Sequence, residues 1–147
     1  MKFGLMIYAI ALQPMIDFYV NVLGFRVRES DDESAALMAD ECELVLLQAP
    51  TDIANSVHVT CPPQAREATP IKPVFFIHEN LAELRARVHQ WSGHFNDVTQ
   101  EWAYHGDTVC DGWDLEGNIF QGRCSETGLM TAHTPDERIN AEINRLS

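Results

Sequence analysis

Gln121 and Arg123 are two polar side chains in the strand predicted at residues 118–124, and alternation places them on one face. A guanidinium beside an amide can hold an anionic ligand through forked hydrogen-bond donors. The alternative is an Arg that is solvated at the rim of the sheet. The strand follows an acidic turn, residues 114–118, in which Gly117 tolerates the positive φ of a tight reversal. A β-hairpin is therefore predicted to present both side chains on one face. The other side chains on that face determine which ligand or reaction is possible.

Other side chains that could do chemistry lack the partners that a reaction needs. Tyr8 could act as an acid or hydrogen-bond donor, or lie in the core with its hydroxyl satisfied. His105 is a candidate general base, although its surroundings favour a turn between strands. Cys110 and Cys124 lie in strand patterns and are predicted to be small buried hydrophobes. Because Ser/His/Asp triad motifs and Gly-rich phosphate loops are also missing from the sequence, no catalytic residue is assigned.

The composition is that of an acidic globular protein. The chain has 147 residues, 46% of them hydrophobic and 22% charged, which is ordinary for one domain with a full core. The formal net charge of −12 argues against nucleic-acid and anionic-membrane partners, because both need basic surfaces. No apolar run reaches the length of a membrane span, no export signal precedes the first strand pattern, and the cysteines form no Cys-x-x-Cys pair. We therefore expect a cytoplasmic protein with reduced thiols.

The first third of the chain predicts a strand, a helix and three further strands. Residues 3–10 are a continuous apolar run, typical of a buried strand. Pro14 suits the first turn of a helix, whose apolar side chains recur at helical spacing until Gly24 caps it. The three further strands are expected at 25–29, 35–39 and 43–48.

The same order recurs after a proline-rich stretch. Prolines interrupt residues 50–73, which are predicted to be a crossover linker with at most a short strand at 57–60. A strand, a helix capped by Asn80, and three strands follow at 74–77, 81–91, 98–104, 108–113 and 118–124. A last short helix from Thr134 has an apolar face that needs a surface to cover. We expect one domain: module one at 3–49, the linker at 50–73, module two at 74–124 and a tail at 125–147.

This repeated βαβββ pattern resembles the vicinal oxygen chelate superfamily, which includes glyoxalase I, extradiol dioxygenases, and fosfomycin and bleomycin resistance proteins. Residues 18–25, Phe-Tyr-Val-Asn-Val-Leu-Gly-Phe, resemble the end of the first-module helix of that family. Residues 114–118 resemble its Asp-Pro-Asp-Gly-Asn turn, with Leu115 where Pro is usual. The resemblance covers residues 3–124 and implies an α+β fold. Two tandem modules would form a cup-shaped mixed sheet, with the helices on its convex side and a short C-terminal helix.

The resemblance also locates the positions at which metal-using members carry a His or Glu. Aligned on the two motifs, these positions are Gly4, Val45, Pro73 and Gln121. Three of the four side chains offer no ligand atom, and a neutral amide is a poor single ligand for a transition metal. We therefore expect no metal and no cofactor. Glu43, Gln48 and His78 lie nearby, but using them would require register slips that turn side chains to the other face.

Strand alternation from the matched positions predicts the lining of the cup. The predicted ligand-binding residues are Met6, Tyr8, Phe75, Ile77, Trp102, Trp113, Ile119, Gln121 and Arg123, and Tyr104 is a further candidate. An apolar concavity with a few polar groups is typical of a small-molecule site. For any one aromatic residue, filling the core is the alternative.

Together, these features predict a metal-free small-molecule-binding protein that takes an aromatic or cationic ligand in the cup. Whether it is an enzyme stays open; the alternative function is a glyoxalase-like lyase or dioxygenase with a displaced divalent metal site. A third possibility is an interaction module that docks through the tail helix. We expect a homodimer, since the open edges of half-barrels need covering.

Overall fold

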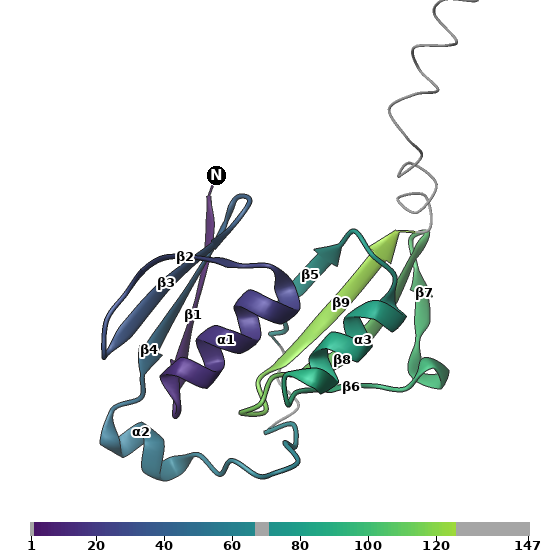
Figure 1. The fold of residues 1–147 in the computed structure, drawn as a ribbon. Helices are drawn as coiled ribbons and strands as arrows, with labels where there is room; N and C mark the ends of the chain where they lie inside the picture. Colours follow the sequence, from purple (N-terminus) through teal and green to yellow (C-terminus); the bar gives the residue numbers. More distant parts are fainter. Residues whose placement is uncertain (1, 67–70, 126–147) are drawn as a thin grey trace, which may run out of the picture.

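The computed structural model describes residues 2–66 and 71–125, which form two βαβββ-like modules that lie side by side (Figure 1). Each module is a mixed sheet, and the helices α1 and α3 lie on the same side of the two sheets (Figure 1). The α+β class with two tandem modules is therefore confirmed. The tail helix predicted from Thr134 lies outside the described residues.

Module one is a four-stranded sheet covered by one helix. It contains β1 (Phe3–Ala9), α1 (Leu12–Leu23), β2 (Arg26–Ser30), β3 (Ser34–Ala39) and β4 (Cys42–Gln48). The strand order is β1-β4-β3-β2, with β1 parallel to β4 and the other neighbours antiparallel. These are the elements that the sequence predicts.

Module two repeats this plan with one additional strand. It contains β5 (Val74–Ile77), α3 (Leu81–Gln90), β6 (His94–Phe95), β7 (Trp102–Tyr104), β8 (Asp107–Trp113) and β9 (Ile119–Ser125). The strand order is β5-β9-β8-β6, and β7 also pairs with β8. β5 and β9 are parallel, whereas β8 is antiparallel to β6, β7 and β9.

Three local expectations need correction. The linker carries a short helix, α2 (Thr51–Ser56), and no strand at 57–60. The two-residue strand β6 was not predicted. The strand predicted at 98–104 is confined to β7, since a 3-10 turn (Val98–Gln100) precedes it. The carboxylate of Asp97 accepts a hydrogen bond from the Thr99 amide, and this local bond favours a turn over an extended strand.

The two sheets also remain separate where a single cup-shaped sheet was expected. β1 and β5 are the end strands of their sheets, and no ladder joins them within the described part of the chain. The two modules are instead connected through side chains on the helix side. There, the ring of Phe75 lies edge-on to Phe25 of module one and to Phe120 of module two, with centroids 6.1 and 5.8 Å away.

The helix signals in the sequence act as expected. α1 begins at Leu12, so Pro14 lies in its first turn, and Gly24 caps its C-terminus with φ +72°. Asn80 caps α3, because its side chain accepts a hydrogen bond from the Glu83 amide. The buried stripe of α3 is Leu81, Leu84 and Val88, as the spacing predicts.

Side-chain alternation gives each sheet two different faces. The helix side carries the core, to which β4 contributes Leu44 and Leu46, and β9 contributes Phe120 and Cys124. We call the opposite face of each sheet its open face. Several large hydrophobic side chains on the open faces are exposed: Met6, Tyr8, Val74, Phe76, Trp102 and Tyr104.

Candidate functional site

The ladder between β5 and β9 decides which side chains share the open face of module two. It pairs Val74 with Gln121 and Phe76 with Arg123. Residues 75 and 77 therefore point to the helix side, where both pack against the core. The prediction that Phe75 and Ile77 share a face with Gln121 is wrong. The residue that pairs with Gln121 is Val74, one position after the predicted Pro73, so every side chain of β5 faces the opposite way.

A row of four hydrogen-bonded side chains crosses this open face. The polar row consists of Lys72, Asp111, Gln121 and Arg123. The Lys72 ammonium pairs with Oδ2 of Asp111. Nε2 of Gln121 donates to Oδ1 of Asp111 at 3.2 Å, and a terminal nitrogen of Arg123 donates to Oε1 of Gln121 at 3.4 Å. The orientation of the Gln121 amide is thereby set, with its NH₂ toward a carboxylate and its oxygen toward a guanidinium.

Aromatic rings enclose the Arg123 end of the polar row. The guanidinium carbon lies 5.1 Å from the ring centroid of Phe76 and 4.8 Å from that of Tyr104. The Asp107 carboxylate is 4.0 Å from Nε of Arg123, too far for a hydrogen bond. Beneath this end lies Val109, which pairs with both Trp102 and Arg123 and is fully buried.

The other predicted ligand-binding residues lie in three places. Met6 and Tyr8 are exposed on the open face of module one, beside Val45 and Leu47 of β4. Trp102 is exposed on the open face of module two, two strands from Arg123 with Val109 between them. The structure thus brings Trp102, Gln121 and Arg123 together, but it leaves Met6 and Tyr8 on the other sheet.

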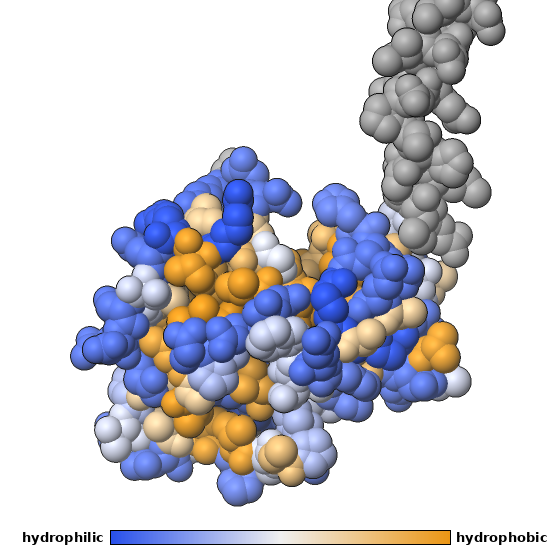
Figure 2. Space-filling model, viewed as in Figure 1, coloured by the Kyte–Doolittle hydropathy of each residue, from blue (hydrophilic) through white to orange (hydrophobic). Residues whose placement is uncertain are grey.

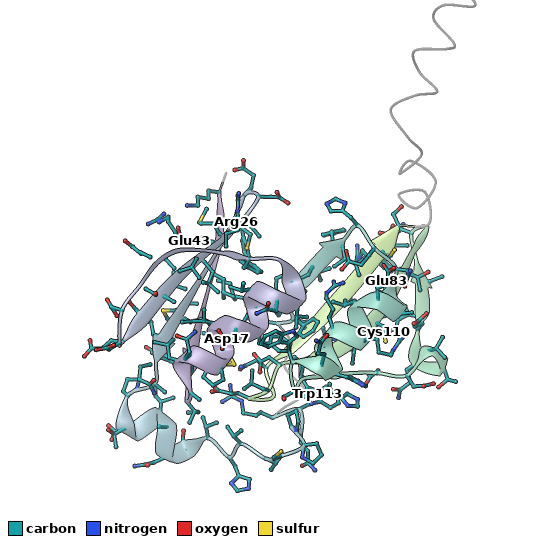
Figure 3. The ribbon with its side chains drawn as sticks, in the orientation of Figure 1. Asp17, Arg26, Glu43, Glu83, Cys110 and Trp113 are labelled. Atoms are coloured by element: carbon teal, nitrogen blue, oxygen red, sulfur yellow. The ribbon has the colours of Figure 1, made fainter. Side chains whose placement is uncertain are left out.

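Trp113 and Ile119 lie opposite each other at the far end of the open face of module two. The Trp113 ring stacks on His94 at a centroid distance of 4.1 Å, and its Nε1 donates to the Pro63 carbonyl of the linker at 2.9 Å. Figure 3 shows Trp113 at the end of module two that is close to the linker. Much of the polar and stacking capacity of Trp113 is therefore already used within the chain.

Two cavities lie between the modules. The larger, about 1070 Å³, is bounded by β1, the end of α1, and β5, and its walls include Phe25, Phe75 and Ile77. Its walls also include Lys72 and Phe76, so it adjoins the polar row. The smaller, about 780 Å³, lies between β1, the linker and the turn after β8, and Ile119 lines it. Figure 2 shows a notch between the two modules with hydrophobic residues at its base.

The described residues do not fit the metal site of the family. Gly4 and Val45 lie on the open face of module one and provide no donor atoms. Glu43 pairs with Gly4 and lies on this face too, so the expectation that it would have to turn from the other face is wrong; its carboxylate is already paired with Lys2 and Arg28. On module two, Val74 is beside Gln121, and the nearest carboxylate, Asp111, is held by Lys72. Among residues 2–66 and 71–125, no three His, Cys, Asp or Glu side chains cluster in a way that could hold a metal ion.

The remaining candidates have structural roles or no reaction partner. Cys110 and Cys124 are buried in the core, as predicted. Burial raises the pKa of the Cys110 thiol, which disfavours the nucleophilic thiolate. His105 lies in the turn between β7 and β8 with φ +49°. Tyr8 is partly exposed on its open face. None of these geometries assigns a catalytic residue.

The acidic turn after β8 has a role that the sequence analysis missed. Its Gly117 has φ +87°, and its backbone closes the predicted hairpin. Asp114 and Glu116 are both buried, and they face module one. Glu116 accepts hydrogen bonds from the Ile10 and Ala11 amides at 2.9 and 2.7 Å, at the start of α1. We call this contact the module latch, and a carboxylate at this position suits the helix N-terminus.

Asp114 completes the latch from inside the turn. It accepts hydrogen bonds from the Tyr19 hydroxyl, the Glu116 amide, and both the amide and the side chain of Asn118. Burial raises the pKa of Asp114, although these four donors oppose that shift. Burial also raises the pKa of Glu116, and the neighbouring charge of Asp114 adds to the effect. The pKa of Tyr19 is raised well above its ordinary value by burial and by Asp114.

The family model described as Glyoxalase/Bleomycin resistance protein/Dioxygenase superfamily matches residues 5–109. The chain therefore belongs to this superfamily, and the resemblance found in the sequence is confirmed. No curated protein matches the chain in sequence. No helix among the described residues is long and apolar enough to cross a membrane.

Solved structures share the fold at low sequence identity. The fosfomycin resistance protein FosX from Listeria monocytogenes, complexed with Mn(II) and sulfate ion, is 13% identical, with a TM-score of 0.60 over 90% of this chain and 96% of that chain. An integron cassette protein from V. cholerae is 15% identical, with a TM-score of 0.58 over 84% and 94% of the two chains. A glyoxalase/bleomycin resistance protein/dioxygenase from Alicyclobacillus acidocaldarius is 17% identical, with a TM-score of 0.57 over 86% and 92%.

Proposed function

We propose that this chain is a metal-free small-molecule-binding protein of the glyoxalase/bleomycin resistance type. The observation that carries the proposal is the cavity of about 1070 Å³ between the modules, whose walls include Lys72 of the polar row and Phe76, the ring beside Arg123. Its apolar walls adjoin the oriented polar groups of the row, and small-molecule sites combine these two features. Exposed rings at Phe76, Trp102 and Tyr104 favour a ligand with an aromatic part.

The donor set supports a function without a metal. Lys72 already supplies a positive charge to Asp111, the carboxylate nearest to Gln121. A divalent cation at this place would have to displace the ammonium and would then find one carboxylate and one amide. The FosX structure named above contains Mn(II). The same chemistry here would need ligands that the described open faces do not supply.

Native mass spectrometry of the protein, purified without chelator, tests this proposal. We expect the apparent mass to show no stoichiometric metal and to shift with compounds from an aromatic metabolite panel. Calorimetry then gives their affinities, with Phe76→Ala as the site variant and Val27→Ala, an exposed position on β2, as the control. Stoichiometric zinc, nickel, iron or manganese would instead favour the glyoxalase-like lyase or dioxygenase. Failure of every compound to bind would contradict the binding function.

We also propose a homodimer. The support is the exposed hydrophobic set on the open faces, which a second copy could cover in part. Light scattering at micromolar concentration should give twice the mass of 16.6 kDa. A monomeric mass at that concentration would exclude the dimer and would leave the ligand proposal unchanged.

A further inference from the structure

Arg123 is the charged side chain of the polar row whose hydrogen-bonding capacity is least used. A guanidinium has five N–H donors. Among the described residues, Arg123 makes one long hydrogen bond, to Gln121, and its buried Nε has no hydrogen-bond partner. The side chain is only 18% exposed, so bulk water has little access to replace these partners.

Arg85 provides a matched comparison within the same module, because its side chain is also 18% exposed. Its Nε donates to the Asn96 carbonyl at 2.7 Å, and a terminal nitrogen pairs with the Glu101 carboxylate. Arg85 also lies over an aromatic ring, that of Phe95. The two arginines thus share burial and stacking, and they differ in the oxygen atoms available to their donors. Arg85 has an acceptor both at Nε and at a terminal nitrogen, whereas Arg123 has none at Nε and only the long contact to Gln121 at a terminal nitrogen.

We propose that Arg123 binds an oxyanion of the ligand, a carboxylate, phosphate or sulfonate carried on an aromatic or apolar body. The guanidinium carbon lies over the rings of Phe76 and Tyr104, which offer no oxygen acceptor, so its unused N–H donors remain for a two-oxygen acceptor. The two rings are 70% and 48% exposed, so they also offer surface to the body of the ligand. This inference names the ligand class of the proposed small-molecule site and rests on that function; Arg123 adjoins the cavity through Phe76, whose ring lines it.

The charged neighbours of Arg123 affect how strongly it can bind an anion. The Lys72 ammonium is engaged by Asp111, so Arg123 is the cation of the row that remains for a ligand. Asp107 is the carboxylate that faces Nε, at 4.0 Å, and it competes for the same positive charge without forming a hydrogen bond. Removing the charge of Asp107 should therefore strengthen binding of an anion.

Three probes of nearly equal shape and different charge test the ligand class: benzoate, neutral benzamide and cationic benzamidinium. Their dissociation constants are measured by NMR titration of the full chain at low ionic strength, with the Arg123 Nε–H signal observed directly. We expect benzoate to bind at least about tenfold more tightly than benzamide and to shift the Nε–H signal. Benzamidinium should bind most weakly. Phenyl phosphate, benzenesulfonate and inorganic phosphate then show which oxyanion is preferred and whether the aromatic body contributes.

Variants assign the effect to Arg123. Arg123→Met should weaken benzoate binding about tenfold or more and leave benzamide unchanged, whereas Arg28→Met, which removes an exposed charge from module one, should change neither. Asp107→Asn should tighten benzoate binding about two- to fivefold. If Arg123→Met does not fold, Arg123→Lys and the Nε–H shift in the unmodified protein supply the same readout.

Tighter binding of benzamidinium than of benzoate would overturn the oxyanion assignment while supporting the small-molecule function. Benzoate binding without a shift at Arg123 Nε–H, or with full affinity in Arg123→Met, would also overturn it. If none of the probes binds, the oxyanion assignment fails, and the metabolite panel decides separately whether the proposed function fails with it.

Discussion

The two modules share a fold but differ in where their charged side chains lie: at the surface in module one and in buried positions in module two. In module one, the charged side chains of the sheet pair near the surface: Lys2 and Arg28 both contact Glu43, and both are more than half exposed. Figure 3 shows Arg26 and Glu43 at the same end of this sheet. In module two, Asp114 and Glu116 are buried, and Arg123 is largely so. A repeated architecture therefore has its polar chemistry concentrated in one copy.

This difference indicates that the two modules have different structural roles. Module one supplies most of the buried core side chains, including those of α1, whereas module two supplies the latch, most of the polar row and the unsatisfied guanidinium. Substitutions that remove polar groups should consequently be costly in module two and nearly silent in module one. Four substitutions test this contrast.

Asp114→Asn should have the largest effect, a loss of about 2–4 kcal/mol in the free energy of unfolding. The carboxylate accepts four hydrogen bonds, and an amide would turn an NH₂ group toward some of those donors. Urea unfolding at pH 7 measures the change. Asp31→Asn, at an exposed turn of module one that also accepts backbone hydrogen bonds, is the control and should change stability far less. Equal losses in the two variants would remove the contrast between the modules.

Gln121→Glu should cost about 1–2 kcal/mol near neutral pH. The new carboxylate would face Asp111, to which Gln121 now donates a hydrogen bond, and Arg123 would compensate only in part. The cost should shrink at pH 5, since one of the two carboxyl groups can then keep a proton and donate it. Thermal melting at pH 5 and pH 8, with and without zinc, nickel and manganese, measures both effects. A large metal-dependent rise in melting temperature would show that a metal site exists after all.

Glu116→Gln tests the pH dependence of the latch. The folded-state pKa of Glu116 is raised above its ordinary value of 4.5 by burial. A raised pKa means that the folded state binds the proton more tightly, so this contribution to stability is present below the ordinary pKa and is lost as the pH rises through the folded value. The stability advantage of the unmodified protein over Glu116→Gln should therefore be largest near pH 4 and decrease toward pH 8. Urea unfolding across this range measures it, and an advantage that grows with pH would contradict the assignment.

Glu43→Gln should have the smallest effect. Its two ion pairs, with Lys2 and Arg28, connect side chains that remain in contact with water, where such pairs contribute little. A hydrogen bond and the charge of Lys2, together with the charge of Arg28, lower the pKa of Glu43, but their loss should leave the melting curve at pH 7 nearly unchanged. A drop comparable to that of Asp114→Asn would mean that module one also depends on its charged residues.

The sequence predicted the elements, the hairpin and the open face of β1 because these depend on local patterns. Gly24, Asn80 and Gly117 each act within a few residues of themselves. The face of β5 was wrong because its four residues, Val-Phe-Phe-Ile, are apolar on both sides and contain no alternation. The face that each β5 residue presents is determined by its pairing with β9, which is distant in the chain. Gln121 and Arg123 were predicted to share a face, but their partners Lys72 and Asp111 were missed for the same reason, since Lys72 lies outside every strand and meets Asp111 only in the folded chain.

One feature of the sequence points to the latch: the start of α1 lacks a capping residue. α1 begins after Ala11, which has no side-chain oxygen to cap a helix. A helix start without Ser, Thr, Asp or Asn requires a partner from elsewhere, and an acidic turn is a candidate. The burial of Asp114 and Glu116 was not predicted, because acidic residues in a Gly-containing turn are ordinarily exposed to water.

The latch has a consequence for how the protein is made. Glu116 comes 106 and 105 positions after the two amides that it caps, so a ribosome releases α1 long before it synthesises the carboxylate that completes the helix. Until then, those amides have water as their partner. A nascent chain that stops in the linker thus carries an unfinished first helix, and an isolated second half carries a carboxylate stripped of its donors. The hairpin of β8 and β9, made late in translation, therefore completes α1, the first helix that was made.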